Sequence, residues 1–580
     1  MPLGARTIWA GVLLAASLGA QSPTTSGAGE AARPLTPQGL DNLRALARMF
    51  GFVRYFYPSD QAATADWSRV AVDAVRAVEP AVSPSDLAKR LESVFAPMAP
   101  TVRVVPAGMP RPMMEMQSGP FVVLWQYRGL GPPQGKPGTP FFGARFLVPA
   151  TQAPLIAFAP FHEDLPGGVS CMVPMALYRP QGPLAQGRAL PPPPGSAGDR
   201  TVRLAAAIVA WNALEHFYPY FEELGPVWMA ALGPLLSKAS EDADPQAFHA
   251  TLRKMGATLR DGQWLVNGPG APPDAVPPVV WTVAEGHIVA APVAGAAEVH
   301  PGDALLSIDG KLAADVLAAA TAAVPGSTPQ FQREHALPYL LARAAGAKVR
   351  VEIEPAAAPG SRKTVTLECT ARAADLHAKR PDKLAEVEPG IFYLDLSRLT
   401  DTDFNAAVPA LGKAHGLIFD LREGMRGTLQ FAPLFGHLLT RPVQGPPTAD
   451  PIVTRPDGAE TIFQDNQWVA SPIPPYFGAK RAFLAGGRTS GFAETILAIA
   501  AWYKLGEIVG EASGGANGTV NAFTVPGGYE VSFTGERVRQ YDGSALFGVG
   551  IRPTIPVPLT RAGIAAGRDE TLERAIQAVR

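Results

Sequence analysis

From residue 384 to the C-terminus, the pattern of hydrophobic and polar residues predicts strands and helices in alternation. Residues 481–485 and 506–510 are short apolar runs typical of buried strands, and apolar residues recur at helical spacing across 492–503. The sequence GGRTSG, residues 486–491, separates the first strand from the helix and predicts a tight turn. Such alternation of strands and helices predicts an α/β domain with a largely parallel sheet over residues 384–580.

The N-terminal half contains a helical pattern that occurs twice. Residues 43–99 and 204–260 align without gaps, so that Trp67 corresponds to Trp228 and the sequence FYP recurs at the same spacing. Helical repeats of this kind bury their aromatic residues against each other. The pattern therefore predicts two related helical units, in which FYP forms core and a turn rather than a ligand site.

Two other regions have strand-like patterns. Residues 120–128 and 140–148 show the alternating pattern of strands and are separated by Gly/Pro-rich loops. They predict a small β-rich insert. Residues 277–372 contain several short strands, and the sequence HPGDALLSIDG, residues 300–310, resembles the central motif of PDZ domains. PDZ domains bind peptides by adding a strand to a sheet edge, and a structural β-module without a peptide is the alternative. No clear Gly-rich loop for a terminal carboxylate accompanies the motif.

The N-terminus has the pattern of a signal peptide. Arg6 precedes an apolar run, residues 8–18, that is too short to span a bilayer, and small residues favour cleavage before Gln21. An uncleaved anchor is the alternative. Export to the periplasm or the extracellular space is the expectation, with no membrane span after cleavage. The expected segments are a signal peptide (1–20), a linker (21–40), a first helical repeat (41–106), a β-rich insert (107–179), a Pro-rich linker (180–200), a second helical repeat (201–276), a PDZ-like domain (277–375) and the α/β domain (384–580).

Composition narrows the range of partners. The chain has 580 residues, a net charge of −1 and 17% charged residues, which gives no electrostatic basis for binding nucleic acid or an anionic membrane surface. An oxidising compartment would permit a disulfide between Cys171 and Cys369, but their separation in sequence favours two unpaired thiols. No metal-ligand or nucleotide-binding motif is present, so we expect neither a metal nor a cofactor.

The C-terminal region resembles a known enzyme family. The segments VGEASGGANGTVN, VPGGYEVSFTGERV, YDGSALFGVGIRPTIPV and AGIAAGRDETLERAI are similar to the tail-specific (C-terminal-processing, tricorn-like) serine peptidases, in a secreted bacterial subgroup. The resemblance implies a multidomain α/β protein with a ClpP/crotonase-like peptidase domain. It also implies an exported serine-type hydrolase that cuts peptide bonds in peptides or unfolded chain ends.

The positions that carry catalysis in this family are altered here. The resemblance implies a nucleophilic Ser three residues before Glu494, where this chain has Gly491, and a general-base His where it has Gln263 in LRDGQWLV. An amide does not accept a proton at neutral pH. Ser490 is a nucleophile if the turn is re-registered around Gly491, and otherwise caps the following helix or is a plain turn residue. Glu494 is either an orienting group or an acid that complements the helix dipole.

The remaining candidates lie on neighbouring loops. The resemblance implies an oxyanion donor in DLREGMRG, for which Gly424 and Gly427 are the candidates, and Arg422 is expected to hold that loop or pair with an acid. The spacing places neither His415 nor His437 beside Ser490, and Glu511 is a further candidate acid. Two functions therefore remain: a weakly active serine peptidase that uses Ser490, or a catalytically inactive homologue that binds peptides or a partner.

Overall fold

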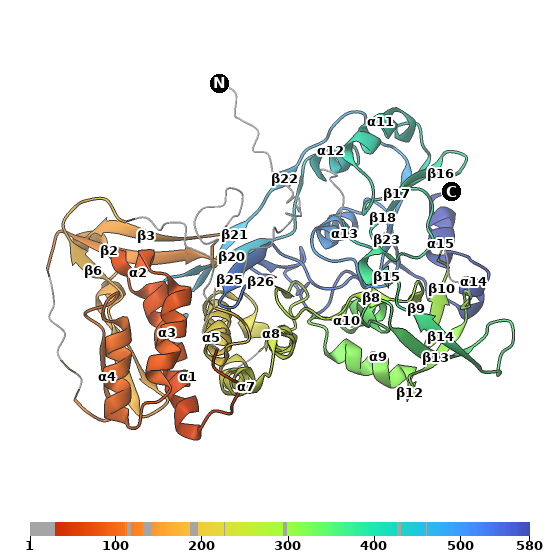
Figure 1. The fold of residues 1–580 in the computed structure, drawn as a ribbon. Coiled ribbons are helices and arrows are strands. Elements are labelled where there is room, and N and C mark those ends of the chain that lie inside the picture. The colour runs from red at the N-terminus through yellow and green to blue at the C-terminus, as the bar shows by residue number, and fades with distance from the viewer. Residues whose placement is uncertain are drawn as a thin grey trace.

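The protein consists of an N-terminal helical part, a β-rich module and a C-terminal α/β domain (Figure 1). The computed structural model describes residues 29–110, 112, 118–131, 141–185, 195–224, 227–293, 298–425, 431–459 and 461–580. The expected signal peptide lies outside these residues. In Figure 1 the N-terminal helices occupy one end of an elongated molecule, and the module and the α/β domain occupy the other.

The N-terminal helices form two groups of four α-helices each, and the first group also contains a π-helical turn. The first consists of α1 (Pro37–Gly51), a π-helical turn (Phe52–Phe56), α2 (Asp60–Thr64), α3 (Trp67–Val78) and α4 (Pro84–Phe95). The second consists of α5 (Arg200–Phe217), α6 (Phe221–Leu224), α7 (Val227–Glu241) and α8 (Pro245–Leu259). Both α4 and α8 begin with Pro after a capping side chain, Ser83 or Asp244, an arrangement that suits the first helical turn.

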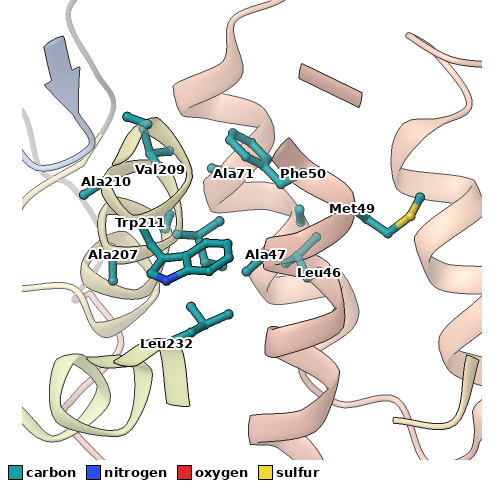
Figure 2. Packing of buried hydrophobic residues seen from close by; sticks show 14 of the residues in the cluster. Leu46, Ala47, Met49, Phe50, Ala71, Ala207, Val209, Ala210, Trp211 and Leu232 are labelled. Carbon is teal, nitrogen blue, oxygen red and sulfur yellow. The ribbon is translucent and has the colours of Figure 1, made fainter. Parts of the chain in front are cut away.

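Aromatic residues at matching positions pack the two units. The rings of Phe50 and Trp67 lie 5.3 Å apart, and those of Trp211 and Trp228 lie 6.3 Å apart. Figure 2 shows Trp211 of α5 against Leu46 and Ala47 of α1, so both units contribute to one core. The FYP segments are part of this core: Phe56 and Phe217 are buried in it. They serve packing rather than ligand binding.

The strands of the β-rich insert are divided between two sheets. Strands β1 (Arg103–Pro106), β4 (Phe161–Leu165) and β5 (Val169–Val173) form a sheet of their own. By contrast, β2 (Phe121–Arg128), β3 (Phe142–Pro149) and β6 (Leu177–Arg179) join β20 (Thr448–Val453), β21 (Ile462–Asn466) and β27 (Arg537–Val538). The insert is therefore completed by a β-arm of the C-terminal domain, formed by β20 and β21. The sequence periodicity of the insert indicated its strands but not their partners. Strands β19 (Val443–Gln444) and β22 (Val469–Ala470), which flank β20 and β21 in the sequence, pair with each other.

The β-rich module has a separate core and a defined neck. Its sheet has the order β14-β13-β11-β10-β9, and β8 (Ala275–Val276) pairs with β15 (Ala371–Arg372) where the chain enters and leaves. The strands and helices are β9 (Val280–Ala284), β10 (His287–Ala291), β11 (Ala304–Ile308), β12 (Lys311–Leu312), α9 (Ala313–Ala322), α10 (Pro329–Ala336), β13 (Lys348–Glu354) and β14 (Lys363–Glu368).

The C-terminal domain is a three-layer α/β structure. Its sheet has the order β16-β17-β18-β23-β24-β28, and all neighbours are parallel except β16 and β17. Alternate residues face opposite sides, so Leu417 packs with α13 (Phe492–Trp502) while Ile418 packs with α15 (Glu570–Val579). The other elements are β16 (Leu384–Glu388), β17 (Ile391–Asp395), α11 (Asp401–Leu411), β18 (Gly416–Asp420), α12 (Phe431–Gly436), β23 (Lys480–Ala485), β24 (Glu507–Gly510), β28 (Ile555–Pro556) and α14 (Arg561–Ala565).

A small sheet connects the second helical unit to this domain. Strand β7 (Leu265–Asn267) pairs with β26 (Tyr529–Thr534), which in turn pairs with β25 (Val520–Val525). The expected second repeat, 201–276, is therefore too long, because its helices end at Leu259. The segment after α8 instead belongs to the surroundings of the candidate site.

Two further observations concern the chain as a whole. Cys171 and Cys369 are both buried and form no disulfide, and burial raises the pKa of the Cys171 thiol to about 12. Within the described ranges, no helix combines the length and the apolar character needed to cross a membrane.

Candidate active site

The junction between β23 and α13 is a strand–turn–helix junction, and the residue at the start of the helix is Gly491. Gly491 is the N-cap of α13, with φ 60° and ψ −134°. This conformation is strained for residues with a Cβ atom, although a Cβ placed there would meet no atom within 4 Å. Acyl-transfer enzymes use such a strand–turn–helix junction to present a Ser beside backbone N–H groups. Here the position is glycine.

Hydrogen bonds on both sides fix the register of the 486–491 turn. The buried Thr489 hydroxyl donates to the Leu421 carbonyl (2.9 Å) and accepts from the Gly486 N–H (3.0 Å). The Gly514 N–H donates to the Thr489 carbonyl at 2.8 Å, and the Gly491 N–H donates to the Ala516 carbonyl at 2.7 Å. The turn is therefore not re-registered in this structure.

Ser490 lies between these two backbone bonds. Its side chain is half-buried and does not cap α13, because Gly491 occupies the N-cap without any side-chain hydrogen bond. Within the described residues the Ser490 hydroxyl has no hydrogen-bond partner. The hydroxyl is thus one residue away from the junction and is not engaged by the turn.

Glu494 organises the loop that faces the turn. Its buried carboxylate accepts hydrogen bonds from the Ser513 hydroxyl, the Gly515 N–H (2.7 Å) and the Ala516 N–H (2.9 Å). Burial raises the pKa of Glu494 to about 7, although all three donors oppose this shift. Glu494 therefore acts as a structural anchor for the 513–518 loop rather than as an acid that faces solvent.

Gln263 reaches the same loop from the other side. Its N–H donates to the buried carboxylate of Asp261, and its side-chain Nε2 donates to the Gly518 carbonyl at 2.8 Å. Its Oε1 is buried and lacks a partner in the described part of the chain. Positions 263, 491 and 494, which are far apart in sequence, thus converge on the 513–518 loop. Sequence analysis identified all three.

Several residues around the loop were missed by sequence analysis. Asp261 also accepts from the N–H (2.8 Å) and the hydroxyl (2.7 Å) of Thr534, which fixes the segment that carries Gln263. Glu536 accepts from the N–H and the hydroxyl of Thr519, next to Gly518, and burial raises its pKa. The density of glycine in the sequence GEASGGANG marks the loop, but no local pattern identifies its distant partners.

The loop after β18 differs from the expected oxyanion loop. The Gly424 N–H donates to the Leu421 carbonyl at 2.9 Å within a turn, where the residue has φ 73°. In this conformation the amide is not available to an oxyanion, so the expectation for Gly424 is not supported by the geometry. Gly427 lies outside the described residues.

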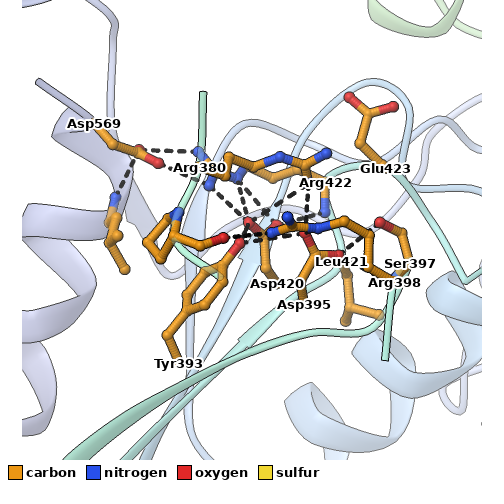
Figure 3. Close-up of polar contacts among 12 residues, drawn as sticks. Arg380, Tyr393, Asp395, Ser397, Arg398, Asp420, Leu421, Arg422, Glu423 and Asp569 are labelled. Atoms are coloured by element: carbon orange, nitrogen blue, oxygen red, sulfur yellow. Dashed lines mark hydrogen bonds and ion pairs between the residues drawn. The ribbon is translucent and has the colours of Figure 1, made fainter. Parts of the chain in front are cut away.

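Arg422 is confirmed as the residue that pairs this loop with acids. Its guanidinium donates to Asp420 at 2.7 Å and to Asp569 at 2.8 Å, as Figure 3 shows. Burial alone would raise the pKa of Asp420, but the charge and hydrogen bonds of Arg422 lower it to about 2. We call this group the ion-pair cluster; its members are Arg380, Tyr393, Asp395, Arg398, Asp420, Arg422 and Asp569.

The other candidate bases and acids serve structural roles. His415 is exposed in the loop that precedes β18, at the opposite end of the strand from the turn. His437 stacks on Phe477 at 4.7 Å and bonds to the Pro475 carbonyl. Glu511 pairs with Arg333 of the module at 2.7 Å. Across the described ranges, no three His, Cys, Asp or Glu side chains are grouped to hold a metal ion.

A cavity of about 600 Å³ lies between the module and the α/β domain. The cavity is lined by the whole of β9 and, from the α/β domain, by residues that include 485–488, 510–512, 553 and 556–559. The residues from 485 to 488 lead directly into the turn at Gly491. The volume falls in the range of typical ligand sites, roughly 300–1,000 Å³, and the site lies at the carboxyl ends of the parallel strands, where α/β sheets commonly bind ligands.

Comparisons with known proteins agree with this architecture. Residues 390–557 match the model of peptidase family S41. A crystal structure of a CPAF mutant is similar with a TM-score of 0.55 and 15% identity, covering 66% of this chain and 97% of that chain. A structure of mature CPAF has a TM-score of 0.53 at 15% identity, covering 64% and 96%. No curated protein matches the chain.

The structural similarity concerns the fold alone, and the family match covers the turn, the 513–518 loop and the members of the ion-pair cluster from Tyr393 to Arg422. The α/β domain is therefore similar to peptidase family S41, the family of the tail-specific serine peptidases, over residues 390–557.

Proposed function

We propose that this protein binds peptides or unfolded chain ends at the S41 site and hydrolyses them weakly or not at all. The observation that carries the proposal is Gly491: the position that presents the nucleophile has no side chain, and its turn is fixed on both sides. Gln263 at the position of the base supports the same conclusion, because its amide cannot take up a proton at neutral pH.

The expected activity is far below that of an intact peptidase. Without a nucleophile and a base, backbone donors and binding remain, and in dissected triads these retain roughly 10³–10⁴-fold acceleration over water. The cavity beside the turn supports retained binding, because it has the volume of a ligand site and lies between two units that are joined by hydrogen bonds and an ion pair. Thr328 of the module donates to the Gly514 carbonyl at 2.7 Å, and Arg561 pairs with Glu354 at 2.5 Å.

A second candidate function is a peptidase that uses Ser490. The observation that favours it is the unengaged, half-buried hydroxyl next to Gly491. In this case a small shift of the turn during substrate binding would bring the hydroxyl to the junction. The pattern of residues 1–20 supports the further proposal that the protein works outside the cytoplasm.

Hydrolysis of fluorescently labelled casein separates the two candidates. We expect little hydrolysis by the wild type and no change in Ser490→Ala. The double variant Gly491→Ser with Gln263→His restores both positions and is expected to gain activity. Gly491→Ala with Gln263→His is the matched control, because it places the same backbone strain at 491 without a hydroxyl. Brisk hydrolysis by the wild type that Ser490→Ala abolishes would instead establish Ser490 as the nucleophile.

A further inference from the structure

Strand β3 leaves one edge of the sheet that it shares with the β-arm unpaired. The sheet has the order β21-β20-β2-β3, so β3 pairs with β2 on one side and with no described strand on the other. No described strand is longer than its eight residues. Its sequence, FGARFLVP, contains no Lys and has Pro only at its end, although such residues commonly protect an exposed edge from pairing.

The hydrogen-bond register shows which peptide groups of β3 point to the free edge. The Ala150 N–H donates to the Pro120 carbonyl at 2.9 Å, and the register places these two residues directly opposite each other. Bonded and non-bonded pairs alternate in an antiparallel ladder, so the even-numbered residues of β3 bond to β2. The peptide groups of Gly143, Arg145 and Leu147 therefore point away from β2.

The other side of β2 agrees with this assignment. The Gly129 N–H donates to the Pro451 carbonyl at 2.9 Å, so the odd-numbered residues of β2 bond to β20 and the even-numbered ones bond to β3. Within the described residues, the main-chain groups of Gly143, Arg145 and Leu147 make no hydrogen bond outside the sheet. Each of these three residues thus offers one N–H and one C=O group to a further strand.

The two faces of β3 differ in their surroundings. Arg145 points towards the helices, where its guanidinium donates to Asp60 at 2.6 Å and its charge is neutralised. Alternate residues lie on the opposite face, and there Phe142 is 43% and Phe146 is 41% exposed. Large apolar side chains beside an unpaired edge are typical of a surface that pairs with another chain.

The strand is complementary to a second copy of itself. With a twofold axis through Ala144, two β3 strands run antiparallel and Phe142 lies opposite Phe146 of the second copy, on both sides of the axis. Gly143 then lies opposite Arg145 of the second copy, and both have peptide groups that point to the edge, so these groups bond directly. The Phe pairs occupy non-bonded positions, where opposite side chains are closest.

Other registers are less favourable. An axis through Arg145 places two like charges opposite each other and moves Phe142 from an aromatic partner to Val148. An axis through Gly143 pairs only residues 142–144 of the strand with each other. An axis between two residues places an outward peptide group opposite an inward one and forms no ladder.

We propose that the protein forms a symmetric homodimer in which two β3 strands pair antiparallel about an axis at Ala144. The two copies then share one continuous sheet and cover their exposed Phe side chains in pairs. A net charge of −1 gives little repulsion between copies. Figure 1 shows β3 at the end of the molecule away from the module, so the dimer leaves the cavity open. The inference is independent of whether the candidate active site turns over substrate.

Sedimentation velocity of the chain from Gln21 onwards tests the proposal. Pairing of one strand covers less than a standard interface of about 1,600 Å², so we expect a monomer–dimer transition between about 1 and 200 μM. Ala144→Lys and Ala144→Glu each place two like charges at the axis, and each should weaken self-association at least about tenfold. An equimolar mixture of the two variants pairs opposite charges and should recover association to within about threefold of the wild type.

Gln464→Lys and Gln464→Glu are the matched controls. They change the net charge equally but lie on β21, at the other edge of the sheet, where the Gln464 side chain is exposed. Both should associate within about twofold of the wild type. A wild type that remains monomeric over the whole range overturns the inference, and the edge of β3 then serves another segment or another protein. The inference is equally overturned if the mixed variants associate no better than either variant alone.

A cross-link provides a second measurement that does not depend on charge. Opposite residues at a non-bonded position have Cα atoms about 4.5 Å apart, within the range of a disulfide. Cys171 and Cys369 are buried, so the thiol of Ala144→Cys is the accessible one. We expect mild oxidation to convert at least about half of this variant, at dimer-forming concentration, into a disulfide-linked dimer. Gln464→Cys should stay monomeric, and equal cross-linking of the two variants overturns the inference.

Discussion

The 486–491 turn and the ion-pair cluster lie at the carboxyl ends of adjacent parallel strands, but they differ in the side chains at their central positions. The turn has no side chain at Gly491, whereas Arg422 in the cluster keeps acids on both sides (Figure 3). A side chain at position 491 would have no packing contact within 4 Å of its Cβ and would be strained at a positive φ. Loss of one member of a buried ion pair leaves an uncompensated charge. An intact cluster is therefore evidence of folding requirements, not of catalysis.

The largest expected effect tests the cluster. Arg422→Met keeps much of the side-chain volume but leaves Asp420, which is fully buried, without its main partner. We expect a loss of about 3–5 kcal/mol in the free energy of unfolding, as for other broken buried pairs. Urea unfolding followed by circular dichroism measures it.

Arg398→Met is the matched control for this experiment. Arg398 also pairs with a buried acid, Asp395 at 2.7 Å, but its own side chain is 40% exposed and Arg380 provides a second cation. We expect a loss of at most about 1 kcal/mol. Equal losses in the two variants would mean that the cluster does not depend on Arg422.

The second effect concerns Glu494 and pH. Burial keeps this carboxyl protonated up to about pH 7, whereas a Glu in the unfolded chain releases its proton near pH 4.5. Between these values the native state binds more protons, so its free energy of unfolding falls as the pH rises. Relative to Glu494→Gln, the wild type should lose roughly 3 kcal/mol from below pH 4.5 to above pH 7.

Measuring unfolding midpoints across this pH range checks the expectation. Exposed Glu530→Gln is the control and should keep the pH dependence of the wild type. If Glu494→Gln follows the wild-type curve in parallel, Glu494 is ionised in the native state. The loop would then be held by a carboxylate rather than by a carboxylic acid.

The third effect tests the backbone of the turn. Gly491→Ala places a Cβ at φ 60°, ψ −134° in open space, so the expected loss of about 1–2 kcal/mol arises from backbone strain alone. Gly486→Ala is the control, because its Cβ also meets no atom within 4 Å and its φ is not positive. Thermal unfolding should show a shift for the first variant and almost none for the second.

Local sequence patterns predicted the elements of the turn because their causes are local. The expected strand 481–485 and helix 492–503 correspond to β23 (Lys480–Ala485) and α13 (Phe492–Trp502), whose apolar periodicity reflects burial in one layer. The family resemblance likewise assigned positions 491, 263 and 494 to one site, and all three contact the 513–518 loop.

Contacts between distant strands could not be predicted in this way. The pairing of β2 with β20 and of β7 with β26 joins segments hundreds of residues apart, and a period of two does not specify a partner. For the same reason the sequence did not reveal that Asp261 fixes Gln263 through Thr534. The bond between the Gly424 N–H and Leu421 was equally hidden, because it depends on how one loop turns.

The smallest expected effect concerns Ser490, whose hydroxyl is the candidate nucleophile of the turn. Its side chain is half-buried and has no hydrogen-bond partner within the described residues, so Ser490→Ala should change the free energy of unfolding by less than about 0.5 kcal/mol. Thr489→Ala is the contrasting variant, because it removes two hydrogen bonds from a buried site and should lose about 1–3 kcal/mol. A large loss in Ser490→Ala would show that its hydroxyl holds the turn, and the reason to regard it as an available nucleophile would disappear.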